Sequence, residues 1–363
     1  MTNPLNTCAS EQNNQQAQQE SPTSTAETNA PVKKKFRLLI AIAKLLVLIL
    51  VIVWITLQLQ KSWTEILAYA WTPRWSWLIA SGLFYLCGYF PASLFWYLSL
   101  CWLGQKPNFF KSILAYYSSQ LGKYVPGKAM VVVIRTGMIV SERVRVSVAA
   151  VSVFYETLTM MGSGAFIGAL IVFFFFRENA VFSLIALGVA VCSVTPLLPP
   201  LFVRVLKVLK VGKNDPNVQE ALKNLKYRHL IIGFALMTVL WVFFGLSLWA
   251  VIRGIGVEPG PLLDSLPRYI ASVSLATSLG FVVVISPGGL GVREMLLSKL
   301  LIPFFSLILG NPVNSAFNIA PEALATIISI LQRIISIIAE VLTFLIMAIC
   351  YVCLKKRRPN QNQ

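Results

Sequence analysis

Residues 146–176 read VSVAAVSVFYETLTMMGSGAFIGALIVFFFF, a run of 31 residues with a single charge, Glu156. An α-helix needs about 20 apolar residues to cross the hydrocarbon core of a bilayer, so a run of this length is typical of a membrane-spanning helix. Residues 36–59 form a second such run, again with one charge, Lys44. These runs predict an all-α, polytopic integral membrane protein.

The composition of the whole chain supports this class. Hydrophobic residues make up 56% of the 363 residues and charged residues only 12%, with a mean hydropathy of +0.72. A soluble globular protein of this length needs more polar surface than that. We expect six unbroken spans, at residues 38–59, 76–103, 146–176, 180–203, 229–252 and 321–354.

The spans divide the chain into three parts. Residues 1–32 are rich in Asn, Gln, Ser and Thr and cannot bury a core, so we expect a disordered cytoplasmic tail rather than a signal peptide. Residues 33–354 are expected to form the transmembrane domain, and residues 355–363 a short basic cytoplasmic tail.

The basic residues are distributed unevenly between the two sides of the predicted membrane. Of the 31 Lys and Arg residues, 22 fall on the side of the N-terminus and only five on the other. Since cytoplasmic loops carry an excess of Lys and Arg, we expect both termini in the cytoplasm and the protein in the cytoplasmic (inner) membrane. The net charge of +17 then reflects this bias and attraction to anionic inner-leaflet lipids, and it requires no nucleic acid.

A basic stripe follows the predicted span at 180–203. Arg204, Lys207, Lys210 and Lys213 recur every three residues among Val and Leu. This pattern is typical of a helix that lies on the membrane surface, and a docking patch for a partner is the alternative.

Two further apolar regions, residues 109–140 and 262–310, are interrupted by Pro and Gly. The first contains SILAYYSSQLGKYVPGKAMVVVIRTGMI (residues 112–139) and the second YIASVSLATSLGFVVVISPGGLGVREMLL (residues 269–297). In each, a Ser-rich helix ends in Leu-Gly, a Pro-Gly pair follows, and an arginine opens the next apolar piece. Pro removes a backbone donor and Gly tolerates left-handed dihedral angles, so each pair stops a helix.

These breaks predict a cavity within the membrane. Backbone groups freed by a break are tolerated in lipid only where protein or a water-filled cavity satisfies them. With the orientation above, we expect the first segment to enter from the cytoplasm and the second from outside, as re-entrant hairpins. Inverted hairpins of this kind are typical of transporters that bind their substrate near the midplane. Ordinary loops at the membrane surface are the alternative.

Charges inside the spans and beside the breaks indicate what such a cavity binds. Glu156, Arg333 and Glu340 lie within predicted spans, where an isolated charge costs about 2.5–3.5 kcal/mol, so each should face a partner or water. We expect Glu156 to pair with Arg333, either as a purely structural ion pair or as counter-charges of a transport site. The cations that flank the breaks are expected to form a phosphate-attracting lining; they are Lys123, Lys128, Arg135 and Arg293.

Three motifs resemble those of a known family. They are Gly122–Lys128 (GKYVPGK) followed by Arg135, the pair Tyr155-Glu156, and Ser286–Glu294 (SPGGLGVRE). In their order and spacing, the chain resembles the transmembrane region of lysylphosphatidylglycerol synthases and their stand-alone flippase-like relatives, over roughly residues 35–354. Relatives carry an aromatic residue soon after Pro-Gly-Lys, where this chain has Ala129 and Met130.

The resemblance implies a helical membrane domain that moves lipids between leaflets. The expected substrate is a phospholipid or a lipid-linked group such as a polyprenyl phosphate or a glycolipid, and a homodimer is compatible with the sequence. The breaks and the resemblance together indicate the substrate-binding residues Gly122, Lys123, Pro126, Gly127, Lys128, Arg135, Glu156, Pro287, Gly288, Gly289, Gly291, Arg293, Glu294 and Arg333.

Two other classes of function compete with transport. An enzyme would need paired acids, a His cluster or metal-ligand spacing, yet the chain has only two Asp residues, Asp215 and Asp264, and one His, His229. The aminoacyl-transfer domain of the full-length synthases is also expected to be absent, because only residues 355–363 follow the last span. We therefore expect no catalytic residues, metal or cofactor. A membrane scaffold or regulator of an envelope or polysaccharide export system would leave no motif, and it is the main alternative.

Overall fold

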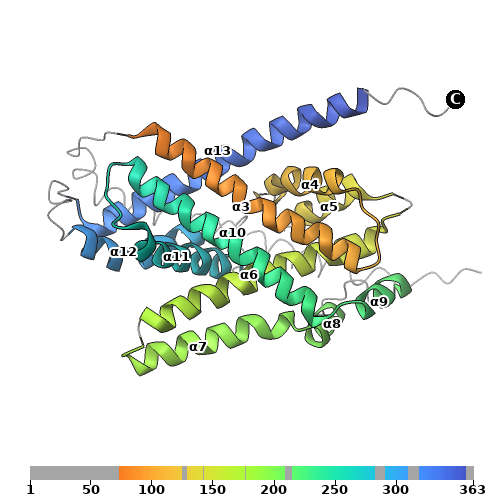
Figure 1. Ribbon diagram of the computed structural model, residues 1–363, viewed down its shortest axis with the longest axis horizontal. Helices are drawn as coiled ribbons and strands as arrows, with labels where there is room; N and C mark the ends of the chain where they lie inside the picture. The colour runs from red at the N-terminus through yellow and green to blue at the C-terminus, as the bar shows by residue number, and fades with distance from the viewer. Residues whose placement is uncertain are drawn as a thin grey trace, which may run out of the picture. The chain divides into compact units, whose positions relative to one another are not determined.

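The computed structural model describes residues 73–124, 129–141, 143–175, 177–208, 215–282, 291–309 and 319–356. Within these ranges every regular element is a helix (Figure 1). The elements are α3 (Trp75–Trp102), α4 (Phe109–Ser118), η1 (Ser119–Tyr124), α5 (Ala129–Ile139), α6 (Val146–Phe175), α7 (Ala180–Val194), η2 (Thr195–Leu197), α8 (Pro199–Val208), α9 (Pro216–Lys223), α10 (Tyr227–Gly254), α11 (Leu262–Val282), α12 (Val292–Leu309) and α13 (Pro321–Lys356).

Five of these helices are long and apolar enough to cross a membrane. They are α3, α6, α7 continued through η2, α10, and α13 from Pro321 to Ile349. The predicted all-α, polytopic membrane protein is therefore confirmed. Five of the six expected unbroken spans are present, and the expected span at 38–59 lies outside the described residues.

The span expected at 180–203 is shorter than predicted. It ends at Leu197, and a separate helix begins at Pro199. Pro196 and Pro199 lack the N–H donor that a continuous helix needs at each position, so the chain turns here. The apolar run in the sequence hid this boundary, because Pro itself does not lower the hydrophobicity of the run enough to end it.

The new helix, α8, has the character expected of the basic stripe. Phe202 and Leu206 are buried, whereas Arg204 and Lys207 on the same helix are exposed. One face therefore packs on the bundle and the other is free to meet water or lipid head groups. Lys210 and Lys213 lie outside the described residues.

The antiparallel packing of α3 with α10 defines the two ends of the bundle. At one end the Arg74 N–H donates to the Gly254 carbonyl oxygen at 2.8 Å. At the other end the rings of Trp102 and His229 stack with their centroids 4.3 Å apart. We call this second end the basic end, because the loops and helix ends beside it carry Lys106, Lys111, Arg143, Arg145, Lys223, Lys226 and Arg228.

Close contact between α6 and its neighbours depends on glycine. A Cβ atom at Gly164 would lie 2.4 Å from a ring carbon of Trp241 in α10 and 2.6 Å from the Ser278 hydroxyl oxygen in α11. Both distances are well below van der Waals contact, so α10 and α11 can approach α6 only because this position has no side chain.

We predict that Gly164→Ala destabilises the protein by about 1–3 kcal/mol, because the added methyl group overpacks the contact with Trp241. Gly188→Ala is the matched control, since nothing lies within 4 Å of its Cβ position on the exposed face of α7. Thermal unfolding of the purified protein in detergent checks the pair. Equal midpoints for the two variants would show that the close approach at Gly164 is not tight.

Candidate functional site

The first broken segment is a re-entrant hairpin that enters from the basic end. α4 has 10 residues and α5 has 11, so at about 1.5 Å per residue neither helix can cross a hydrocarbon core of about 30 Å. The two ends of the hairpin lie together, because the Lys106 N–H donates to the Arg143 carbonyl oxygen at 3.3 Å. From α4, η1 continues inward to Lys123 and Tyr124.

Gly122 lets the returning helix approach η1 closely. A Cβ atom at this position would lie 2.8 Å from the backbone nitrogen of Val131 in α5. Backbone can approach backbone this closely only where one side has no Cβ. Three further predicted site residues join η1 to α5 and lie outside the described residues: Pro126, Gly127 and Lys128.

The second broken segment is a hairpin that enters from the opposite end. Near its open end the Arg268 guanidinium lies 5.5 Å from the ring centroid of Phe304. Near its tip, a Cβ atom at Gly280 in α11 would lie 3.2 Å from the Cβ of Arg293 in α12. Gly291 precedes α12 with a φ of 84°, a dihedral angle that favours glycine. The predicted residues between the two helices lie outside the described part: Pro287, Gly288 and Gly289.

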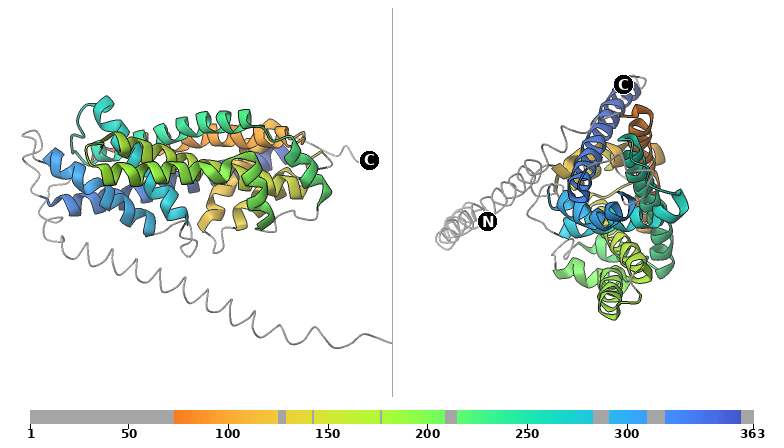
Figure 2. Two further views of the ribbon diagram at one scale, coloured as in Figure 1. Left: turned by 90° about the horizontal axis from the view of Figure 1, so that it is seen from below. Right: turned by 90° about the vertical axis from the view of Figure 1, so that its left-hand side faces the viewer.

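The two hairpins are inverted relative to each other, as expected. In Figure 1 and in the left view of Figure 2, α4 and α5 lie at the same end of the bundle as α8 and α9, whereas α12 lies toward the other end. The described contacts at the base and tip of each hairpin agree with this arrangement.

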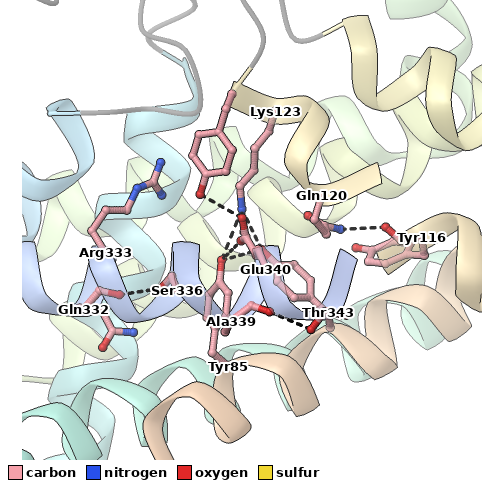
Figure 3. Close-up of polar contacts among 12 residues, drawn as sticks. Tyr85, Tyr116, Gln120, Lys123, Gln332, Arg333, Ser336, Ala339, Glu340 and Thr343 are labelled. Carbon is pink, nitrogen blue, oxygen red and sulfur yellow. Dashed lines mark hydrogen bonds and ion pairs between the residues drawn. The ribbon is translucent and has the colours of Figure 1, made fainter. Parts of the chain in front are cut away.

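Both hairpin tips meet α13 through ion pairs. Lys123, from the first tip, pairs with Glu340, and Figure 3 shows its side chain reaching the carboxylate. Glu294, from the second tip, faces Arg333 with 3.3 Å between Oε1 and Nε. Arg333 and Glu340 are seven residues apart, about two helical turns, so the two ion pairs are neighbours along α13.

This junction lies near the middle of the membrane-spanning part. Glu340 accepts a hydrogen bond of 2.5 Å from the Tyr85 hydroxyl of α3. Tyr85 is ten residues, about 15 Å, from the start of this 28-residue span. The described part of the first hairpin therefore reaches deep into the bundle, which favours a re-entrant hairpin over a loop at the membrane surface.

Tyrosine hydroxyls complete the surroundings of Glu340. Tyr124 donates to its Oε2 at 2.9 Å, while Tyr85 and Lys123 share Oε1. The Lys123 ammonium group also lies 3.3 Å from the Tyr89 hydroxyl. With only 2% of the residue exposed, Glu340 is a buried carboxylate whose two oxygens are both hydrogen-bonded, as buried charges in proteins generally are.

Cations outnumber carboxylates at the junction. Arg293 is 8% exposed and precedes Glu294 at the second tip, where a Cβ atom at Gly280 would lie 3.2 Å from the Cβ of Arg293. Among the described residues it forms no ion pair. The junction cluster, which we define as Lys123, Arg293, Arg333, Glu294 and Glu340, thus has three positive and two negative side chains.

The expected pairing of Glu156 with Arg333 is wrong. Glu156 pairs with Arg135 at 2.7 Å between Oε2 and Nη1, and both side chains are almost fully buried. Tyr116 donates to the other Glu156 oxygen at 2.8 Å, and Arg135 also donates to the Ser119 hydroxyl at 3.0 Å. The re-entrant course of the hairpin explains the difference, because it brings α5 back beside α6 at the level of Glu156.

Arg135 is therefore not part of an open cationic lining. Its guanidinium is held between the carboxylate of Glu156 and the rings of Trp96 and Tyr116, whose centroids lie 5.2 Å and 4.1 Å away. Of the predicted site residues, the structure brings together Lys123, Arg293, Glu294 and Arg333, with Gly122 and Gly291 beside them, and it places Arg135 and Glu156 in a separate pair.

Sequence reasoning missed the partner of Lys123 and the tyrosines around it. Glu340 was recognised as an intramembrane charge but was not placed in the site. Tyr85 and Tyr89 are four residues apart on one face of a spanning helix, and their hydroxyl oxygens lie 2.9 Å apart. Two tyrosines with this spacing inside an apolar run are the signal that could have located a polar face on α3.

We predict that Glu156→Gln and Arg135→Met each destabilise the protein by about 3–5 kcal/mol, because each leaves one buried charge without its partner. The double variant, which removes both charges, should be destabilised by less than half as much as either single variant. Unfolding of the detergent-solubilised variants gives the coupling energy of the pair.

Glu258→Gln removes a partly exposed partner of Arg253 and is the matched control, with an expected cost below about 1 kcal/mol. Strictly additive effects of the two buried substitutions would contradict a direct Arg135–Glu156 interaction.

Comparison with known proteins agrees with the helical architecture. A family model described as "Lysylphosphatidylglycerol synthase TM region" matches residues 41–311. No curated protein matches the chain. The matched range contains both broken segments and ends before α13, the helix that provides Arg333 and Glu340. Because the match covers well over half of the sequence, the chain belongs to the family of lysylphosphatidylglycerol synthase transmembrane regions.

Proposed function

We propose that the protein moves an anionic phospholipid, or a lipid-linked phosphate, between the two leaflets of the membrane without covalent chemistry. The observation that carries this proposal is the junction cluster, where two inverted hairpin tips meet on α13 with one more cation than carboxylates. A buried excess of positive charge favours an anion as the missing counter-charge.

The arrangement suits transport because each hairpin reaches the cluster from a different end of the bundle. A substrate held there is separated from the basic end by the first hairpin and from the opposite end by the second. Rocking of one hairpin while the other stays closed would open the site to one leaflet at a time, as in other transporters with broken helices. Lysylphosphatidylglycerol synthase transmembrane regions are named for a lipid enzyme, which agrees with a lipid as the substrate.

The ion pairs of the cluster can exchange partners more readily than the Arg135–Glu156 pair. The Lys123 side chain is 21% exposed and that of Arg135 is 3%. An incoming phosphate can therefore reach the Lys123 ammonium group while Glu340 keeps its two tyrosine donors. Charge-assisted hydrogen bonds to a phosphate contribute about 1.5–3 kcal/mol each, enough to offset part of the cost of moving a charged head group into the membrane.

Reconstitution into liposomes tests the proposal directly. Proteoliposomes that contain fluorescent or native phosphatidylglycerol should show faster transbilayer movement than protein-free liposomes of the same composition. Because the mechanism needs no bond to form or break, the lipids recovered afterwards should be chemically unchanged. Mass spectrometry of the recovered lipids and dithionite quenching of outer-leaflet fluorophores provide the two readouts.

Two other outcomes of this experiment favour the competing classes of function. If no anionic, aminoacylated or polyprenyl-phosphate lipid moves faster, a scaffold or regulator of an export system becomes the better explanation. A covalently altered lipid would instead indicate an enzyme.

We also predict that Arg293→Lys lowers apparent substrate affinity about tenfold or more, which corresponds to about 1.4 kcal/mol. A lysine keeps the charge but loses the planar, bidentate contact that a guanidinium makes with a phosphate. The dependence of transport rate on lipid fraction gives the apparent affinity. Arg204→Lys, on the exposed face of α8, is the matched control and should behave like the unmodified protein.

The same loss in both variants would show that these arginines serve only to orient the protein in the membrane. If both variants transport lipid normally, the junction cluster does not bind the substrate, and the assignment of the fold is unaffected.

A further inference from the structure

A concave region lies at the basic end, away from the junction cluster. It has a volume of about 730 Å³ and lies between the end of α3, the start of α4 and the loop that follows α5. Three of the residues that line it are cationic, Lys106, Lys111 and Arg143, and none of the described lining residues is acidic. Glu142, beside Arg143, lies outside the described residues. We call this region the basic pocket.

The loops that form the basic pocket are held by specific hydrogen bonds. The Gln105 side-chain oxygen accepts from the Arg145 N–H at 2.9 Å, and the Lys106 N–H donates to the Arg143 carbonyl oxygen at 3.3 Å. These bonds tie the chain before α4 to the chain after α5. The cations are therefore carried on connected backbone rather than on independent loops, so the pocket is preorganised.

The start of α4 adds to the positive potential of the pocket. Asn108 lines the pocket and caps the helix, its side-chain oxygen accepting from the Lys111 N–H at 3.1 Å. Phe109 and Phe110 begin the helix, where backbone N–H groups have no carbonyl partner within the helix. The helix dipole and these N–H groups favour an anion at the same place as the three cationic side chains.

The position of the pocket indicates where its ligand comes from. α3 ends at Trp102 and α6 begins at Val146, so the pocket lies at the level where two membrane spans stop. Tyr97 lines the pocket, and Phe110, in the first turn of α4, is 79% exposed. Aromatic side chains at span ends are typical of the boundary between hydrocarbon and head groups. A ligand at this level can keep its acyl chains in the membrane while its phosphate enters the pocket.

We propose that the basic pocket binds the phosphate group of an anionic membrane phospholipid. The site is separate from the junction cluster, and the proposal does not depend on transport. A bound lipid would join the base of the first hairpin to the end of α3. A volume of several hundred Å³ is suitable for a complete glycerophosphate head group.

Native Cys101 provides a test without any substitution, because it lines the pocket and is partly exposed. The purified full-length protein is placed in nanodiscs of phosphatidylcholine alone or with phosphatidylglycerol, and maleimide modification of each cysteine is followed by peptide mass spectrometry. Phosphatidylglycerol should slow the modification of Cys101 several-fold. Cys8, which lies outside the expected spans, is the internal control and should react equally in both membranes.

Neutralising the pocket should remove this protection. The triple variant Lys106→Gln, Lys111→Gln and Arg143→Gln is expected to bind phosphatidylglycerol at least about tenfold more weakly, since it loses three charge-assisted contacts. The matched control replaces three other basic residues of the same end with the same change in charge, Lys223→Gln, Lys226→Gln and Arg228→Gln, and should retain both binding and protection. All six side chains are exposed, so neither variant disturbs the core.

Three results would overturn the proposal. Equal loss of binding in the two triple variants would show that general surface charge, and not the pocket, binds the lipid. Protection of Cys101 by millimolar inorganic phosphate in phosphatidylcholine nanodiscs would point to a soluble ligand instead of a lipid. Unchanged modification of Cys101 in the presence of phosphatidylglycerol would show that no lipid occupies the pocket. Because all readouts measure binding, failure here leaves the transport proposal intact, and failure of transport leaves this one intact.

Discussion

The arrangement of this protein depends on the need to pair charges that lie within a membrane span. α13 carries Arg333 and Glu340 inside a helix that is otherwise apolar enough to cross the bilayer. Each would be costly if left alone in hydrocarbon. Their partners, Glu294 and Lys123, come from the tips of two separate hairpins. The short helices of the hairpins are thus anchored deep in the bundle by the charges of one long helix.

A second buried ion pair has a different role. Arg135 and Glu156 join the returning half of the first hairpin to α6, and both are enclosed by aromatic rings and hydroxyl groups. Neither side chain has appreciable exposure, so a substrate could reach them only after the hairpin had separated from α6. We interpret this pair as a fixed attachment, whereas the partly exposed Lys123 is suited to exchange its partner. If the protein transports lipid as proposed, a hairpin that is fixed along its returning helix and adjustable at its tip is suited to gating.

The junction cluster also differs from the Arg135–Glu156 pair in its net charge. The Arg135–Glu156 pair is neutral as it stands, but the cluster on α13 holds three cations and two carboxylates. Neutrality could be reached there by binding one anion. The basic pocket also favours an anion, yet it lies at the end of the bundle, where two of the spans stop. The two sites would therefore meet the same class of lipid at different depths.

The sequence by itself determined the class of the protein, most of its spans and the two breaks. These features are local: a run of apolar residues needs no partner to indicate a span, and a Pro-Gly pair stops a helix wherever it occurs. The motifs around Lys123, Glu156 and Arg293 also located the family from sequence alone. Even so, the local pattern placed the end of the 180–203 span too late, because a Pro inside an apolar run lowers hydrophobicity only slightly while it ends the helix.

Only the tertiary structure decided which charge pairs with which. Glu156 and Arg333 both lie within expected spans, which made them plausible partners. However, depth within a span does not specify which face a helix presents or which helix lies next to it. The re-entrant turn placed Arg135 at Glu156, and the meeting of the two tips on α13 placed Lys123 at Glu340. Residues 217 positions apart in the chain become hydrogen-bonded neighbours there. Such pairing depends on how whole helices pack, and the spacing of residues along the chain does not reveal that packing.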